Sequence, residues 1–374
     1  MTALPPEAYA AALAGLSGMN VTRLGSLLRH CAPPHAWALV RGEVPAAPDI
    51  AHVMADGARR AQWARSAAQT DVEALWVRCT ELNVAVVPWG DPRYPVALLD
   101  DPLPPPVLFV QGDLSLLAGR RVGIVGTRNA TAAGRHTAER MGHQLAAAGV
   151  HVVSGLARGI DGCAHRGVLA AEATGRPIAV VASGHDVVYP REHGDLWAAV
   201  GNCGLLLSEA PPGTRPEAYR FPMRNRIIAG LSEALVVVES RERGGSLLTA
   251  NDAMARNVPL MAVPGPVGRR IGAGTNQLLC DGAMPVTGAD DVLTHLSFHH
   301  ERLFLEPADL RPRPRPDDVP AYRVLQREPR TLDGVALALG AGLIEAAMAL
   351  ARLEAAGWIA QVDGWFECVG SPLK

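Results

Sequence analysis

An open α/β fold of Rossmann type, with a mostly parallel sheet covered by helices on both faces, is the fold class that the sequence predicts. Six short apolar segments alternate with helical patterns, at residues 121–126, 150–155, 178–183, 205–208, 235–239 and 260–263. These segments are apolar almost throughout, as strands buried on both faces are. Ligands of such sheets bind at the carboxyl ends of the strands, so the loops that follow the segments are the first candidates for a site.

The composition is that of a folded globular protein. Of 374 residues, 48% are apolar and 19% are charged, and no apolar run is long enough to cross a membrane. The start of the chain has no basic region before its apolar stretch, so we expect no signal peptide and a cytoplasmic location. Six cysteines without any C-x-x-C pair argue against disulfides and zinc. The formal net charge of −2 means that any site for a polyanion must be a local patch.

Residues 1–80 predict a small helical domain of the SAM or helix-hairpin-helix type. Two or three short helices fit residues 1–40, where glycines interrupt the pattern, and further helical patterns cover residues 53–68 and 72–82. With so few basic residues there, a packing role is favoured over DNA binding. A strand at 84–87 and a proline-rich connector at 102–106 then lead into a Rossmann-like domain over residues 81–310.

The end of the chain predicts a winged helix over residues 319–374. A helical segment at 290–296 is followed by a Pro/Arg linker at 311–318. Helices are then expected at 319–326, 331–339 and 342–356, and Asp363-Gly364 favours a hairpin turn between strands at 358–361 and 365–369. The third helix is poor in side chains that read bases, which favours a protein contact or a vestigial role over sequence-specific DNA reading.

Two glycine loops that carry an arginine are candidate phosphate sites. After the first strand, Gly126 allows a turn, Arg128 projects, and Thr131 can cap the next helix. After the second strand comes S-G-L-A-R-G-I-D, in which the candidate residues are Ser154, Gly155, Arg158 and Gly159. Backbone N–H groups at a helix start bind anions, although the same loops also occur as plain βα turns. Neither loop is G-x-G-x-x-G, and no acidic residue ends the second strand, so a dinucleotide cofactor is disfavoured.

An arginine-rich segment with aromatic neighbours precedes the fifth strand. Its candidate residues are Arg220, Phe221, Arg224, Asn225 and Arg226. Guanidinium groups that bind phosphates, beside rings on which bases stack, are typical of a groove for single-stranded nucleic acid. The alternative is that these arginines pair with neighbouring glutamates.

A third glycine-hydroxyl loop opens the next helix and suits phosphate oxygens. Its candidates are Ser246 and Thr249. Catalytic groupings are not found: there is no G-x-S-x-G elbow, no H-E-x-x-H and no Walker loop, and the histidines at the strand ends have no paired nucleophile. The sequence therefore predicts a binding protein with no catalytic residue, metal or cofactor.

These motifs together resemble the DprA/Smf family of DNA-processing proteins. The resemblance spans roughly residues 80–295 and is carried by G-T-R (126–128), S-G-L-A-R-G-I-D (154–161), Y-P (189–190), S-E (208–209), F-P-M-R-N-R-I-I-A-G-L-S (221–232), S-L-L-T-A (246–250) and V-P-G (263–265). It implies a non-catalytic homodimer of natural transformation that binds incoming single-stranded DNA and loads the RecA recombinase. It also places a phosphate contact on Arg128 and another on Arg191, and Tyr189 or Phe221 would offer a stacking face.

Two other functions remain open on the same sequence. A nucleotide-processing enzyme of the phosphoribohydrolase type would use a P-G-G-x-G-T loop followed by a catalytic glutamate, but the loop here leads to Asn251-Asp252. A regulator of double-stranded DNA would use the winged helix, whose third helix offers only Glu345 and Arg352 as obvious contacts.

Overall fold

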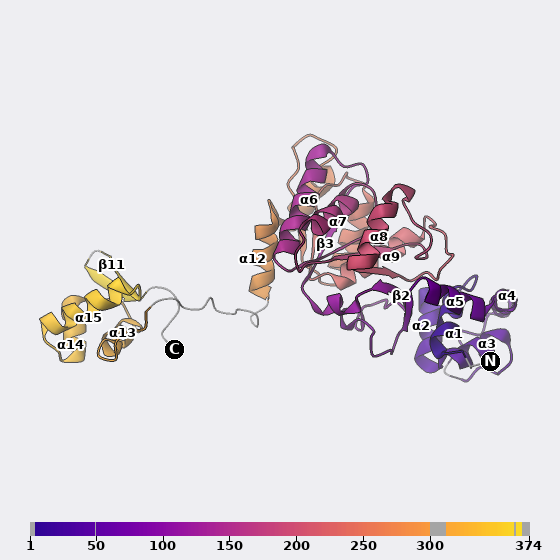
Figure 1. Ribbon diagram of the computed structural model, residues 1–374, viewed down its shortest axis with the longest axis horizontal. Coiled ribbons are helices and arrows are strands. Elements are labelled where there is room, and N and C mark those ends of the chain that lie inside the picture. The colour runs from indigo at the N-terminus through magenta and orange to yellow at the C-terminus, as the bar shows by residue number, and fades with distance from the viewer. Residues whose placement is uncertain (1–3, 49, 300–311, 363, 369–374) are drawn as a thin grey trace. The chain divides into compact units, whose positions relative to one another are not determined.

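The computed structural model describes residues 4–48, 50–299, 312–362 and 364–368 (Figure 1). The chain divides into two compact units, residues 1–299 and 300–374.

A nine-stranded sheet forms the centre of the first unit, with strand order β1-β2-β6-β5-β4-β3-β7-β8-β9. The strands are β1 (Ala85–Pro88), β2 (Val107–Gly112), β3 (Arg121–Val125), β4 (His151–Ser154), β5 (Pro177–Val181), β6 (Leu205–Ser208), β7 (Ala234–Val237), β8 (Leu260–Ala262) and β9 (Met284–Pro285). From β6 to β9 all neighbouring strands are parallel. The predicted mostly parallel α/β fold is confirmed, and the six predicted strands are β3 to β8.

The sequence reading missed β2, which extends the sheet as an antiparallel strand between β1 and β6. Its apolar run follows directly on the proline-rich connector and shows no helix beside it, so it lacks the alternation that revealed the other strands. Leu108 and Val110 pack with one side of the sheet, whereas Val107 and Phe109 pack with the N-terminal helices. β2 therefore joins the core of the sheet to the core of the helical part.

Helices cover both faces of the sheet. One face packs against α6 (Ala132–Ala147), α7 (Ile160–Ala170), α8 (Gly194–Cys203) and α12 (Ala289–His299), and the other against α9 (Arg220–Leu231), α10 (Gly245–Met254) and α11 (Ala273–Cys280). Buried valines and isoleucines of the strands alternate between the two cores; Val153, for example, faces α9 while Val152 faces α6. Both faces are thus apolar, as the sequence pattern indicates.

Five helices precede the sheet. They are α1 (Pro6–Ala14), α2 (Val21–His30), α3 (Pro33–Arg41), α4 (Gly57–Ala68) and α5 (Val72–Glu81). They surround a core with Leu13, Leu27 and Trp63 that also includes Phe109 of β2. The predicted helix at 53–68 begins later, because the Asp56 side chain accepts a hydrogen bond from the Arg59 N–H (3.1 Å) and caps α4. A domain boundary at residue 80 stays a prediction.

In the described part of the second unit there are three helices and a small antiparallel sheet. The helices are α13 (Val319–Leu325), α14 (Leu332–Leu339) and α15 (Leu343–Ala355), and the sheet has strand order β10 (Arg330–Thr331), β12 (Trp365–Cys368), β11 (Ile359–Val362). Thr331 caps α14 by accepting a hydrogen bond from the Gly334 N–H (3.3 Å). The predicted hairpin forms, although Asp363 of its turn and Val369 lie outside the described residues. The order of elements agrees with a winged helix, which stays a prediction.

Among the described residues no single helix has the length and apolar character needed to cross a membrane; α14 and α15 would meet that test only as a bent pair.

Candidate nucleic-acid interface

The strand order reverses beside β3, and the candidate site lies at this position. β3 pairs with β4 on one side and with β7 on the other, so the loops after these three strands leave the same edge of the sheet. In open α/β sheets this crevice is where ligands bind.

The loop after β3 is held firmly but presents Arg128 to solvent. Buried Glu239, which follows β7, accepts hydrogen bonds from both the N–H and the hydroxyl of Thr131 (2.9 Å each). The Thr131 hydroxyl in turn accepts from the Gly134 N–H (3.0 Å) and caps α6. Arg128 is exposed and has no ion-pair partner within the part of the chain that the structure describes. A fixed loop therefore offers one free guanidinium at the strand end.

The loop after β4 depends on glycine at two positions. Gly159 has a φ of +74°, and a Cβ there would lie 2.3 Å from the Thr127 carbonyl oxygen. A Cβ on Gly155 would lie 2.3 Å from a guanidinium nitrogen of Arg224. The glycines thus allow three segments, the β3 loop, the β4 loop and α9, to approach one another closely.

Arg224 forms the floor of the site. It is 6% exposed, and its Nη1 donates to the Gly155 carbonyl (2.6 Å) and to that of Val180. Burial lowers the pKa of Arg224 to about 10, against the attraction of the nearby Asp161, so the group stays charged at neutral pH. Burial likewise raises the pKa of Asp161, and Arg224 opposes that shift. Because the Arg224 guanidinium is already fixed under the cleft, it attracts an anion without an entropic cost for ordering its own side chain.

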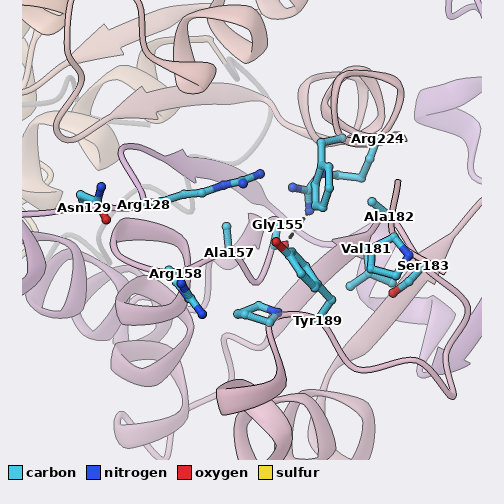
Figure 2. A pocket seen from close by; sticks show the side chains of 13 residues that line it. Arg128, Asn129, Gly155, Ala157, Arg158, Val181, Ala182, Ser183, Tyr189 and Arg224 are labelled. Atoms are coloured by element: carbon cyan, nitrogen blue, oxygen red, sulfur yellow. Dashed lines mark hydrogen bonds between the residues drawn. The ribbon is translucent and has the colours of Figure 1, made fainter. Parts of the chain in front are cut away.

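Two aromatic rings and an arginine form a stack above this floor. The Arg128 guanidinium lies 4.8 Å from the Phe221 ring centre, and the Phe221 ring lies 5.4 Å from that of Tyr189 at an angle of 53°. Figure 2 shows Arg128 pointing toward Arg224, with Tyr189 beside them. Tyr189 is 41% exposed, so its ring face is available for stacking.

The cleft around this stack has a volume of about 170 Å³ and contains no carboxylate in its lining. Three of its lining residues, Arg128, Arg158 and Arg224, are cationic. The side chain of Arg158 is 61% exposed and pairs with Glu192, which is also exposed. Because exposed ion pairs contribute little to stability, a phosphate can displace Glu192 from Arg158 at little cost.

A wider groove continues from this cleft to the start of α10. It shares Arg128, Phe221 and Arg224 with the cleft. The groove is also lined by three further residues that the sequence predicts for the site: Asn225, Ser246 and Thr249. Arg241 and Arg243, both exposed, line it too. Sequence reasoning missed these two arginines as site residues, although both lie within three residues before Gly244-Gly245, at the start of the glycine-hydroxyl loop that it had singled out.

Four of the predicted site residues lie elsewhere. Ser154 is buried and its hydroxyl donates to the Ile124 carbonyl (2.6 Å). Arg191 is exposed but does not line the cleft, and Arg220 pairs with Glu217 (3.5 Å) away from it. Arg226 is buried and pairs with Glu209 (2.5 Å), as the alternative reading of this segment expected. Of the arginines in this segment, only Arg224 reaches the cleft.

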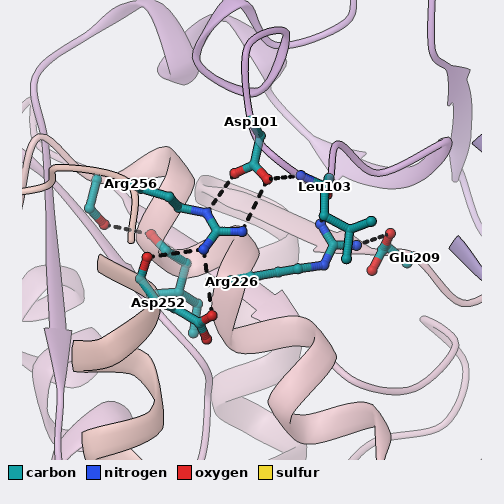
Figure 3. Close-up of polar contacts among 8 residues, drawn as sticks. Asp101, Leu103, Glu209, Arg226, Asp252 and Arg256 are labelled. Carbon is teal, nitrogen blue, oxygen red and sulfur yellow. Dashed lines mark hydrogen bonds and ion pairs between the residues drawn. The ribbon is translucent and has the colours of Figure 1, made fainter. Parts of the chain in front are cut away.

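Arg226 belongs to a network that fixes α9 and α10 to the proline-rich connector (Figure 3). Asp101, immediately before the connector, accepts two hydrogen bonds from Arg256 (2.7 and 3.0 Å) and one from the Leu103 N–H (2.8 Å). Arg226 donates to the Leu103 carbonyl, so both arginines hold the same short segment. The network keeps the helices that carry the site residues in place.

The residues on which the two other functions depend are not free for those roles. Asp252 is absent from the lining of the cleft and of the groove and lies 3.5 Å from Arg256. On α15, Arg352 is held by two hydrogen bonds from its Nε to the Asp318 carboxylate (3.0 and 3.1 Å). Three of the exposed side chains of α15 are apolar: Leu343, Ile344 and Met348.

Comparisons with known proteins agree with the resemblance seen in the sequence. Residues 85–297, more than half of the chain, match the family of DNA recombination-mediator protein A. Protein Smf of Escherichia coli is 36% identical over 314 residues, which cover 82% of this chain and 83% of that protein. The structure of DNA processing protein A from Streptococcus pneumoniae superposes with a TM-score of 0.66 at 31% identity, over 79% of this chain and 98% of that one.

A second solved structure, of DNA processing protein A from Helicobacter pylori, was described for its single-stranded DNA binding mode. It superposes with a TM-score of 0.51 at 26% identity, over 58% of this chain and 97% of that one. The fold, the site at the β3 switch point and these matches lead to one conclusion: the chain belongs to the DNA recombination-mediator protein A family, also called DprA/Smf.

Proposed function

We propose that this protein binds single-stranded DNA in the cleft between the β3 loop, the β4 loop and α9, and that it acts as a mediator that loads RecA onto the strand. The observation that carries the proposal is the composition of the cleft: three arginines, two aromatic rings and no carboxylate. Phosphates are bound by the guanidinium groups and bases stack on the rings, which is the arrangement that single strands require.

The preference for single strands follows from the rings. Phe221 and Tyr189 stand between the cationic side chains, so a base must turn its face toward the protein to contact them. In a duplex those faces are stacked on neighbouring base pairs and are not available. The single-stranded DNA binding for which the Helicobacter pylori relative was described supports the same assignment.

The proposal extends to a homodimer that works in the cytoplasm without catalysing a reaction. The alternative, hydrolysis of a nucleotide, needs an acidic group that is free to act in the groove. Asp252 lies outside the groove beside Arg256, and Asp161, which lines the groove, is buried and accepts a hydrogen bond from the Gly155 N–H (3.2 Å). We therefore expect no release of base from a nucleoside monophosphate.

The test is a fluorescence-anisotropy titration of a labelled single strand and of the matched duplex. We expect the protein to prefer the single strand and Arg128→Ala to weaken binding at least about tenfold, because a charge-assisted phosphate contact contributes about 1.5–3 kcal/mol. Arg140→Ala is the matched control, since Arg140 is also an exposed arginine but lies on α6 outside the cleft lining. Equal binding of both DNA forms, or equal effects of the two variants, contradicts the proposal.

The mediator step has a separate readout. RecA assembly on single strands covered by a single-strand-binding protein should proceed faster when this protein is present, and Arg128→Ala should abolish the gain. An unchanged assembly rate with the wild-type protein would leave DNA binding intact but overturn RecA loading.

A further inference from the structure

A second cavity opens beside the cleft, between the turn that follows α1 and residues of β6 and α9. Its volume is about 500 Å³, within the range of pockets that hold small organic groups. Val181, Ala182 and Arg224 line both this cavity and the cleft. Figure 2 shows these three residues together at the end of the cleft away from Asn129. The two cavities therefore adjoin at these three residues.

The charges of the two cavities differ. The cleft lining has three arginines and no acid, whereas the second cavity is lined by Arg220 and Arg224 and also by Glu209 and Glu217. Glu217 lies 3.5 Å from Arg220. Glu209 pairs through one oxygen with the buried Arg226, and within the described chain no hydrogen bond reaches its other oxygen. With its cations balanced by acids, this cavity does not suit a phosphate, but its polar groups suit the edge of a neutral base.

Tyr219 supplies the aromatic surface of this cavity. Tyr219 is 60% exposed, and the Arg220 guanidinium lies 5.1 Å from the centre of its ring. Tyr219 immediately precedes α9, only two residues before Phe221, whose ring lines the cleft. One short segment thus presents a ring and an arginine to each of two adjoining cavities.

The opposite wall is preformed. The turn between α1 and α2, residues 15–20, lines the cavity. The Ser17 N–H donates to the Ser66 hydroxyl and the Gln62 amide donates to the Ser17 hydroxyl, both over 3.1 Å. These contacts tie the turn to α4, so the wall is held in position without a ligand.

We propose that the second cavity is a nucleobase subsite, in which a base beyond the few nucleotides held in the cleft stacks on Tyr219. The inference rests on the proposed function of the cleft and adds a role for the N-terminal helical part, which would form one side of the DNA path. The sugar-phosphate backbone would remain outside, on the side of Arg220.

The test compares Tyr219→Ala with Tyr219→Phe, which keeps the ring and serves as the matched control. Oligonucleotides of about 4 and about 16 nucleotides cover the range of site sizes known for single-strand-binding folds. We expect Tyr219→Ala to lose about fivefold or more in affinity for the longer strand, as for one stacked base, and to bind the shorter one like wild type. Tyr219→Phe should bind both like wild type.

A second readout detects the base itself. A 2-aminopurine base is moved position by position along the longer strand, and stacking on a ring quenches its fluorescence. One position should be quenched in the wild type and in Tyr219→Phe and be released in Tyr219→Ala, which a merely structural role of Tyr219 would not produce.

The outcomes separate the two proposals. If Arg128→Ala loses affinity but Tyr219→Ala binds the longer strand like wild type, the base subsite is overturned and the cleft assignment stands. Equal weakening of the short and the long strand by Tyr219→Ala also overturns the subsite. If the wild-type protein binds neither strand, both proposals are wrong.

Discussion

The Arg128–Phe221 pair allows phosphate contacts and base contacts to be measured separately. The two groups lie 4.8 Å apart, yet they should serve different parts of the DNA. Arg128→Ala removes a charge-assisted contact of about 1.5–3 kcal/mol, which corresponds to about 10- to 150-fold in affinity. Phe221→Ala removes a stacked base of about 1–3 kcal/mol, a loss of similar size. Affinity at one salt concentration cannot tell these losses apart.

The salt dependence of the affinity distinguishes the two losses. Each neutralised phosphate on a single strand contributes about 0.7 to the slope of log affinity against log salt concentration. We expect Arg128→Ala to reduce the slope by about this amount and Phe221→Ala to leave it unchanged. The assay is anisotropy at four or more salt concentrations on wild type, both single variants and the double variant, about five to ten titrations in each series.

The double variant measures the coupling within the stack. A cation and a ring at an exposed site attract each other by about 0.5–1 kcal/mol, so the two losses should depart from additivity by that amount. The reasoning is refuted if Arg128→Ala leaves the salt slope unchanged, or if Phe221→Ala lowers it as much as Arg128→Ala does. Either result would contradict the assignment of a phosphate contact to Arg128 and a base contact to Phe221.

Two further predictions concern stability. Asp101→Ala should lower the free energy of unfolding by about 3 kcal/mol, because among the described residues it leaves the buried Arg256 with one carboxylate, that of Asp252 at 3.5 Å, and a hydrogen bond to the Asp252 carbonyl (3.0 Å). Urea denaturation measures this, and a loss below about 1 kcal/mol would contradict it. Burial lowers the pKa of His185 in the folded protein to about 4, whereas in the unfolded chain it stays near the usual 6.5. Between these two pH values the unfolded chain therefore binds more protons than the folded protein, and the free energy of unfolding falls as the pH drops through this window. His185→Gln should therefore flatten the pH dependence of unfolding between pH 6.5 and 4 by about 1.4 kcal/mol per pH unit; an unchanged slope would show that His185 is already protonated or solvated in the native state.

The sequence predicts those site residues whose position depends on a single loop. Arg128 stands in a glycine loop after an apolar strand, and that pattern alone puts an exposed cation at the carboxyl edge of the sheet. The segment from Arg220 to Arg226 behaves differently. Arg224 and Arg226 are two residues apart on one helix, so they point in different directions: Arg224 reaches the cleft and Arg226 turns to Glu209. Density of charge in the sequence does not reveal which face of α9 meets the loops.

Local sequence determined the alternation of strands and helices, the glycine turns and the cap at Thr131, because each depends on the properties of neighbouring residues. The strand order, and with it the meeting of the loops after β3, β4 and β7, was decided by pairing between segments far apart in the chain. The same holds for the insertion of β2 and for the wall that residues 15–20 give to the second cavity. Such contacts arise from the shape and burial of whole surfaces, which no short stretch of sequence contains.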